Sequence, residues 1–219
     1  MKRVVVLISG AGRNLQALID AQRHGRLPDC LVGVISSRAD APGVQRARDA
    51  GLPARCITPA DFTDRPEFDA ALMRQIDDWA ADWVVLAGFM RILTPGFTQH
   101  YAGRLLNIHP SLLPRHPGLR THAAARAAGD ARHGATVHFV TEALDGGPRI
   151  IQGALMVRPE DTDETLAERV MVEVERRIYP QAVAWAVAGR LTVDAMGQVG
   201  LDNRTLQAPL SLDDLEAGF

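Results

Sequence analysis

Residues 4–19 read VVVLISGAGRNLQALI. Positions 4–9 form an unbroken apolar run rich in β-branched residues, which is typical of a strand covered on both faces. A glycine-containing loop follows, and then Leu15, Leu18 and Ile19 recur at the spacing of one helix face. A buried strand, a glycine loop and an amphipathic helix in this order predict the first unit of a parallel α/β sheet.

The same alternation continues through the first half of the chain. Strand-like runs are expected at residues 31–36, 54–58, 83–89 and 105–109, with helical segments at 43–50, from Pro66 to Trp79, and after Thr94-Pro95. Strands that alternate with helices form parallel sheets, because each helix is a crossover to the next strand.

The pattern changes after the fifth strand. Runs at 135–141 and 149–157 are joined only by a turn-like segment, so we expect antiparallel pairing. A long helix is expected from about Thr165 to Tyr179, and Pro180 should kink or restart it. Residues 190–207 resemble a small hairpin.

The last dozen residues are polar and acidic, which suggests a loose tail. No internal repeat or low-complexity linker divides the chain. We therefore expect one α/β domain over residues 1–219, with an open, mostly parallel twisted sheet flanked by helices and C-terminal antiparallel strands.

Composition excludes several classes of protein. The chain has 219 residues, of which 24 are Lys or Arg and 26 are Asp or Glu, for a net charge of −2. This balance argues against a nucleic-acid-binding protein, which carries clustered basic residues. No apolar run approaches the roughly 20 residues of a membrane span. Cys30 and Cys56 form no CxxC pair, so we expect reduced core cysteines in a cytoplasmic protein.

The strongest chemical signal follows the fifth strand, where residues 105–114 read LLNIHPSLLP. Asn107 and His109 are two positions apart, so they project from the same face of the strand end. One can hold a carbonyl group and the other can move a proton. Asp145, in the turn-like LDGG segment, is the natural carboxylate to orient the histidine, although Asp-Gly is also a common turn former. These residue types suit acyl transfer without a protein nucleophile.

The loop at residues 9–14 could hold a small anion. Gly10 and Gly12 allow close approach of backbone N–H groups, and the following helix contributes partial positive charge. Leu15 occupies the third glycine position of the dinucleotide fingerprint, and no P-loop lysine follows, so one small phosphate is the better interpretation. A tight turn that binds nothing is the alternative. Arg13 could pair with the phosphate or be solvated.

The segment GFMRIL at residues 88–93 follows the fourth strand. Ligands of open α/β sheets bind at this edge, and an apolar lip there could hold a flat heterocycle. The alternative is that these side chains cap the core. The other histidines show no HExxH-like spacing, so we expect no metal site.

Four of these stretches occur together in one order, as ISGAGRNLQ at 8–16, LAGFMRIL at 86–93, NIHPSLLP at 107–114 and LDGG at 144–147. Together they closely resemble the folate-dependent phosphoribosylglycinamide formyltransferases, over roughly residues 1–190. The PGL and TH sequences at residues 117–122 are similar to this branch rather than to the branch that acts on tRNA.

The resemblance implies a Rossmann-like formyltransferase fold and a set of site residues. The catalytic group would be Asn107, His109 and Asp145. The ribose phosphate would be held by Gly12, Arg13 and Asn14, with Glu175 at the ribose hydroxyls. The folate would contact Arg65, Met90, Arg91, Ile92, Leu93, Asn107, Thr141, Glu142, Ala143, Leu144 and Asp145. Arg13 replaces the Ser that is usual in the family, which leaves its contact open.

The resemblance also implies a division of labour. Residues 1–105 would form a phosphate-binding half, 106–190 a catalytic and folate-binding half, and 191–219 a C-terminal hairpin and tail. The implied activity is formyl transfer from 10-formyltetrahydrofolate, as co-substrate, to the amine of glycinamide ribonucleotide in purine (IMP) biosynthesis, by a monomer or homodimer. Two alternatives remain, namely a formyltetrahydrofolate hydrolase (deformylase) and a non-enzymatic binding protein.

Overall fold

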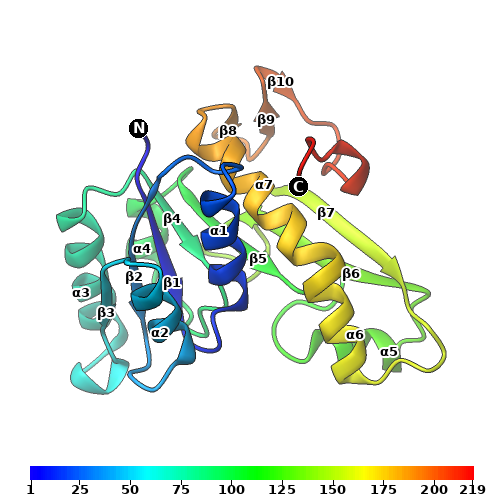
Figure 1. The fold of residues 1–219 in the computed structure, drawn as a ribbon, viewed down its shortest axis with the longest axis horizontal. Helices are drawn as coiled ribbons and strands as arrows, with labels where there is room; N and C mark the ends of the chain where they lie inside the picture. The colour runs from blue at the N-terminus through cyan, green and yellow to red at the C-terminus, as the bar shows by residue number, and fades with distance from the viewer.

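A seven-stranded sheet forms the centre of the computed structural model, which describes residues 1–219 (Figure 1). Its strand order is β3-β2-β1-β4-β5-β6-β7. Strand β1 (Val4–Ile8) pairs with β2 (Leu31–Ser36) on one side and with β4 (Trp83–Leu86) on the other. All five β1 residues are buried, because helices cover both faces of the sheet.

The direction of the strands changes once across the sheet. Strands β1 to β5 are parallel, and they include β3 (Ala54–Cys56) and β5 (Leu105–His109). Strand β6 (Arg132–Phe139) runs antiparallel to β5, and β7 (Arg149–Met156) runs antiparallel to β6. This topology confirms the predicted fold class.

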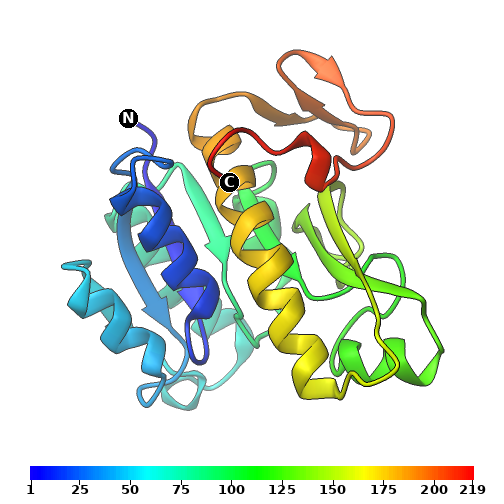
Figure 2. The ribbon, with the colours of Figure 1, turned by 45° about the vertical axis from the view of Figure 1, so that its right-hand side comes forward.

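Helices form a layer on each face of the sheet. One layer contains α1 (Arg13–Arg23), α2 (Pro42–Asp49) and the helical segment that starts at Asp163, and it packs on the Val4, Val6 and Ile8 face of β1. The other layer contains α3 (Arg65–Asp78) and α4 (Pro95–His100). Helix α5 (Thr121–Ala127) lies beside the first turns of the helical segment that starts at Asp163 (Figure 2). None of the helices has the length and apolar character needed to cross a bilayer.

The strand order reverses beside β1. The chain passes from β1 outward to β2 and β3, then returns to place β4 on the other side of β1. In open α/β sheets the crevice at such a reversal, beyond the carboxyl ends of the strands, is where ligands bind. The loops that follow β1 and β4 border this crevice, and the end of β5 is the next position along the same edge.

The long C-terminal helix is interrupted earlier than expected. Helix α6 (Asp163–Val170) is followed by a π-helical turn (Met171–Glu175), and α7 (Arg176–Val187) then continues. The helix does not restart at Pro180, which lies inside α7. A π turn inserts one residue into the helical repeat, and such turns often occur at functional sites. Glu175 is the last residue of this turn.

The last residues are packed, which corrects the expectation of a loose tail. After a small sheet of β8 (Leu191–Val193), β9 (Val199–Leu201) and β10 (Arg204–Thr205), Leu210 forms backbone hydrogen bonds to both Ile150 and Gln152. It thereby covers part of the edge of β7. Sheet proteins usually protect such edges, because an exposed edge strand can pair with another chain.

Polar contacts fix the end of the chain further. Glu216 accepts hydrogen bonds from Trp185 Nε1 at 3.0 Å and from Arg190 Nη1 at 2.6 Å. One of the acidic residues that suggested a tail is therefore paired with groups of α7 and of the residues that follow it.

We expect Gly153→Ala to destabilise the fold. Gly153 lies in β7, and a Cβ built there would overlap the Val174 side chain and lie 3.3 Å from Ile178. Overpacking of this kind costs roughly 1–3 kcal/mol. Urea denaturation should show this loss, and adding Val174→Ala should recover part of it. Gly96→Ala is the matched control, because a Cβ there would meet nothing closer than 3.9 Å. Equal stability of Gly153→Ala and wild type would contradict the close packing described.

Candidate active site

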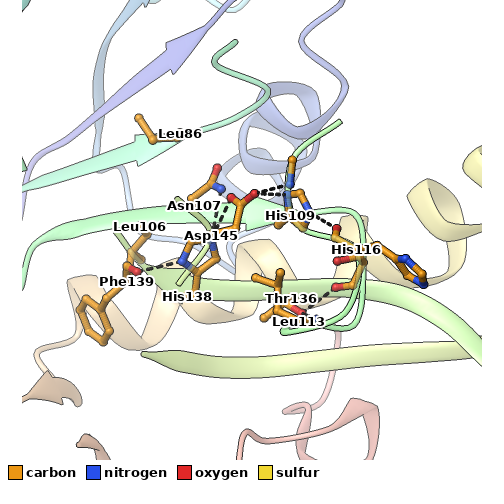
Figure 3. A network of polar contacts seen from close by, with 12 residues as sticks. Leu86, Leu106, Asn107, His109, Leu113, His116, Thr136, His138, Phe139 and Asp145 are labelled. Carbon is orange, nitrogen blue, oxygen red and sulfur yellow. Dashed lines mark hydrogen bonds and ion pairs between the residues drawn. The ribbon is translucent and has the colours of Figure 1, made fainter. Parts of the chain in front are cut away.

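Two residues of β5 and one from a distant loop meet at the end of this strand (Figure 3). Asn107 and His109 project from this strand, and Asp145 comes from the loop between β6 and β7. His109 Nδ1 lies 3.4 Å from Asp145 Oδ2, and both side chains are less than 10% exposed. The structure therefore brings together the three side chains that the sequence singled out. Their burial strengthens the electrostatic interaction between the ring and the carboxylate.

Both ring nitrogens of His109 face oxygen atoms. Nε2 lies 2.9 Å from the carbonyl oxygen of His116, which can only accept, so Nε2 donates this hydrogen bond. Nδ1 faces the Asp145 carboxylate. A neutral imidazole carries one N–H and can satisfy only one of these contacts, whereas the imidazolium form satisfies both. Each ring nitrogen of His109 therefore has an oxygen to which it could donate.

Left-handed backbone conformations hold the segments around the ring. His116, Arg120 and Asp145 have φ values of 52°, 56° and 50°. Non-glycine residues seldom adopt this region, and each such residue costs of order 1–3 kcal/mol. Asp145 Oδ2 accepts a hydrogen bond from Gly118 N–H at 2.8 Å, which joins the two segments. Nothing in the residue pattern indicated this brace, since a backbone group supplies its donor.

His138 is a member of the site that the sequence analysis did not assign. It is the direct cross-strand neighbour of Asn107 on β6. Its Nε2 lies 3.2 Å from Asn107 Nδ2 and 3.9 Å from Asp145 Oδ1. Burial lowers the pKa of His138. Antiparallel pairing of the runs at 105–109 and 135–141 would have indicated this contact.

The glycine loop after β1 has two different glycines. Gly12 has φ 69°, and a Cβ there would lie 2.7 Å from the Gly43 Cα, so the fold itself requires glycine. Gly10 has open space where a side chain would be, which leaves room beside the N-terminus of α1. Arg46, which the sequence analysis missed, donates to the Ala11 carbonyl at 2.8 Å and braces the loop.

Asn14 and Glu175 form a buried pair next to this loop. Asn14 Nδ2 donates to Glu175 Oε2 at 2.6 Å across the packed α1 and π-helical segments. Burial raises the pKa of the Glu175 carboxyl, and the hydrogen bond from Asn14 offsets part of this effect. Asn14 Oδ1 is buried and has no partner. A buried acceptor without a partner is costly, so this position favours a ligand that donates a hydrogen bond.

Arg13 forms an ion pair with Glu168 of α6. The closest approaches are 2.7 Å for each of the two guanidinium nitrogens. The paired geometry is bidentate, although both groups are partly exposed, which limits its contribution to stability. Neither interpretation left open for Arg13 included this pairing with a carboxylate of another helix.

An apolar lip follows β4. Met90 and Ile92 are 66% and 59% exposed, while Phe89 is buried beneath them. A cavity of about 460 Å³ lies beside the lip and is lined by Met90, Arg91, Ile92 and also Arg65. Exposed apolar groups around a cavity are typical of ligand sites. The alternative that this segment caps the core holds for Phe89, which is buried, and for Leu93, which packs partly buried against the same core.

The remaining predicted folate contacts lie elsewhere on the loop after β6. Thr141 and Glu142 line a separate groove of about 280 Å³ beside α4, where Gln99 donates to Glu142 at 2.6 Å. Leu144 is 60% exposed next to Asp145. Neither Leu93 nor residues 141–144 line the cavity beside Met90. The structure thus places predicted folate contacts in two separate cavities, one beside Met90 and one beside Thr141.

Known proteins are similar to this chain over most of its length. The model of the formyl transferase family matches residues 2–183. Over 188 residues the chain is 50% identical to the phosphoribosylglycinamide formyltransferase of Escherichia coli K12, covering 86% of this chain and 88% of that one. The corresponding enzyme of Haemophilus influenzae is 47% identical over 87% of this chain and 90% of that one.

Solved structures agree. The phosphoribosylglycinamide formyltransferase of Coxiella burnetii superposes with a TM-score of 0.91 at 46% identity, covering 96% of this chain and 98% of that one. A formyltetrahydrofolate deformylase from Burkholderia mallei reaches 0.82 at 28% identity, and this chain covers 69% of it. The chain therefore belongs to the formyl transferase family, among the phosphoribosylglycinamide formyltransferases.

Proposed function

We propose that this protein transfers the formyl group of 10-formyltetrahydrofolate to the amine of glycinamide ribonucleotide in purine biosynthesis. The observation that carries the proposal is the buried contact between His109 and Asp145 beside Asn107, at the sheet edge that also carries the glycine loop after β1 and the apolar lip after β4. Family membership supports the same reaction. The products would be formylglycinamide ribonucleotide and tetrahydrofolate.

The chemistry needs no protein nucleophile. The substrate amine attacks the formyl carbon, and the carbonyl oxygen becomes an oxyanion. Cationic His109 and the Asn107 amide are placed to stabilise this charge as it develops. The bond from carbon to the folate N10 then breaks, the amine loses a proton, and N10 gains one. His109 or an ordered water can carry this proton.

The surrounding residues suit the two substrates. The loop at Gly10–Gly12 offers backbone N–H groups to the ribose phosphate, and the pair of Asn14 and Glu175 suits the ribose hydroxyls. The lip and cavity beside Met90 suit the folate, with Arg65 available for a carboxylate of its glutamate tail. We keep the proposed division into residues 1–105 for phosphate and 106–190 for catalysis and folate. We place the reaction in the cytoplasm, in keeping with the unpaired Cys30 and Cys56.

One assay tests the function. The protein is mixed with 10-formyltetrahydrofolate, with and without glycinamide ribonucleotide, and both deformylated folate and formylated amine are measured. Turnover that requires the amine and yields equal amounts of both products is expected. Turnover without the amine would identify a hydrolase, and binding without turnover would identify a carrier. Either result would overturn the proposal.

We expect Asn107→Ala and His109→Ala each to lower kcat by about 10²–10³-fold, the usual loss when one oxyanion donor is removed. Circular dichroism and thermal unfolding should show that both variants remain folded. His24→Ala is the matched control, since His24 is exposed at the end of α1 and should retain full activity. Near-normal turnover in both active-site variants would rule out the mechanism.

Glu175→Gln should weaken substrate binding and alter the pH dependence of stability. Burial raises the folded-state pKa of Glu175, so the stability contributed by this group is fully present below the ordinary glutamate pKa. It is lost as the pH rises through the folded-state value. The variant cannot ionise, so urea unfolding should find it more stable than wild type near pH ~8, with the gain vanishing near pH ~4. A gain that is constant with pH would contradict this.

The Arg13–Glu168 pair predicts opposite effects of two substitutions. If Arg13 can turn from Glu168 to the substrate phosphate, Arg13→Ser should raise the KM for glycinamide ribonucleotide by a few-fold, with kcat unchanged. Glu168→Gln releases the guanidinium and should lower the same KM. Steady-state kinetics at low ionic strength provide the measurement. An unchanged KM in both variants would show that the pair has no part in binding.

A further inference from the structure

We infer that His138 is a positioning residue, whose neutral Nδ1–H tautomer fixes the orientation of the Asn107 amide so that an N–H, rather than the carbonyl oxygen, faces the formyl group. The catalytic part of this inference rests on the proposed function. The part that concerns the tautomer rests on the geometry of His138 alone (Figure 3).

The tautomer follows from the first contact. His138 Nδ1 lies 2.8 Å from the carbonyl oxygen of Phe139, and a carbonyl has no proton to give. Nδ1 must therefore carry the hydrogen. The ring is 2% exposed and burial lowers its pKa, so the neutral form, with a single N–H, is favoured. Nε2 is then a bare lone pair.

The amide orientation follows from the second contact. Asn107 lies 3.2 Å from Nε2, and only its NH2 group can donate to a lone pair, whereas its oxygen would be repelled. One amide hydrogen is used in this bond. The second hydrogen remains available on a half-buried side chain that makes no other hydrogen bond. Without the bare Nε2, the two amide orientations would be much closer in energy.

Nearby charges also affect where the His138 proton lies and how the Asn107 amide is oriented. Asp145 Oδ1 lies 3.9 Å from Nε2, His109 contributes positive charge, and Arg149 is the cross-strand neighbour of His138 on β7. A proton on Nε2 would be drawn to Asp145 or would favour the Asn107 oxygen. Both outcomes remove a donor from the reacting oxygen. With a neutral ring protonated at Nδ1, Asn107 keeps a free N–H for the reacting oxygen and Asp145 stays with His109.

The tautomer can be observed directly in the intact protein. Nitrogen-15 labelling of the histidines and NMR through long-range couplings distinguish protonated from bare ring nitrogens. The His138 signals, assigned by their loss in His138→Gln, should show a protonated Nδ1 and a bare Nε2 near neutral pH. An imidazolium or an Nε2–H tautomer would overturn the inference, whatever the enzyme does.

Kinetics test the effect on Asn107. His138→Leu removes the acceptor and should lower kcat about 10–100-fold with little change in either KM, a loss typical of residues that orient a functional side chain. His138→Gln keeps an acceptor oxygen near the position of Nε2 and should recover most of this loss. Thermal unfolding checks that the variants are folded. Equal losses in the two folded variants would overturn the role.

A double-mutant cycle separates positioning from a general structural role. If His138 acts through Asn107, the double variant Asn107→Ala/His138→Leu should be no slower than Asn107→Ala alone. Additive losses would mean that His138 acts elsewhere. If the wild-type protein shows no formyl transfer, the proposed function fails, and the NMR experiment still decides the tautomer.

Discussion

The alignment of β5 between two neighbours of opposite direction is the constraint on which the site depends. Strand β4 fixes β5 from one side in parallel, with Leu86 opposite Asn107, and β6 fixes it from the other side in antiparallel, with His138 opposite Asn107. A slip of one residue would turn every side chain of β5 to the other face. Hydrogen bonds to both neighbouring strands oppose that slip, so Asn107 and His109 stay on the same face of the sheet, next to Asp145.

The parallel half of the fold was predictable because its signals are local. A strand buried on both faces must be apolar throughout, as β1 and β4 are, and Thr94 followed by Pro95 has the composition of a helix start. The C-terminal part was less predictable. The π turn before α7 and the packing of Leu210 on β7 depend on tertiary contacts, which periodicity does not report.

The candidate site shows the same division. Asn107 and His109 share a strand, so their spacing was enough to pair them, and the family motif supplied Asp145. Arg46 and the backbone of Gly118 carried no such signal, because each contributes only through an element that is distant in sequence. His138 could be found only through the pairing of β6 with β5. Arg13 looked like a phosphate ligand from its position alone. Its partner, Glu168, is more than 150 residues away along the chain.

Ser9 connects the two regions proposed to bind the two substrates. Its hydroxyl accepts from Met90 N–H at 2.8 Å and bonds Ser37 at 2.6 Å, and its own N–H donates to Gly88. Ser9, in the glycine loop after β1, thus hydrogen-bonds directly to the apolar lip after β4. A displacement of the glycine loop would therefore also displace the apolar lip. The distance between the bound donor and acceptor molecules is therefore set by the backbone around Ser9 and not by the side chains that contact each molecule.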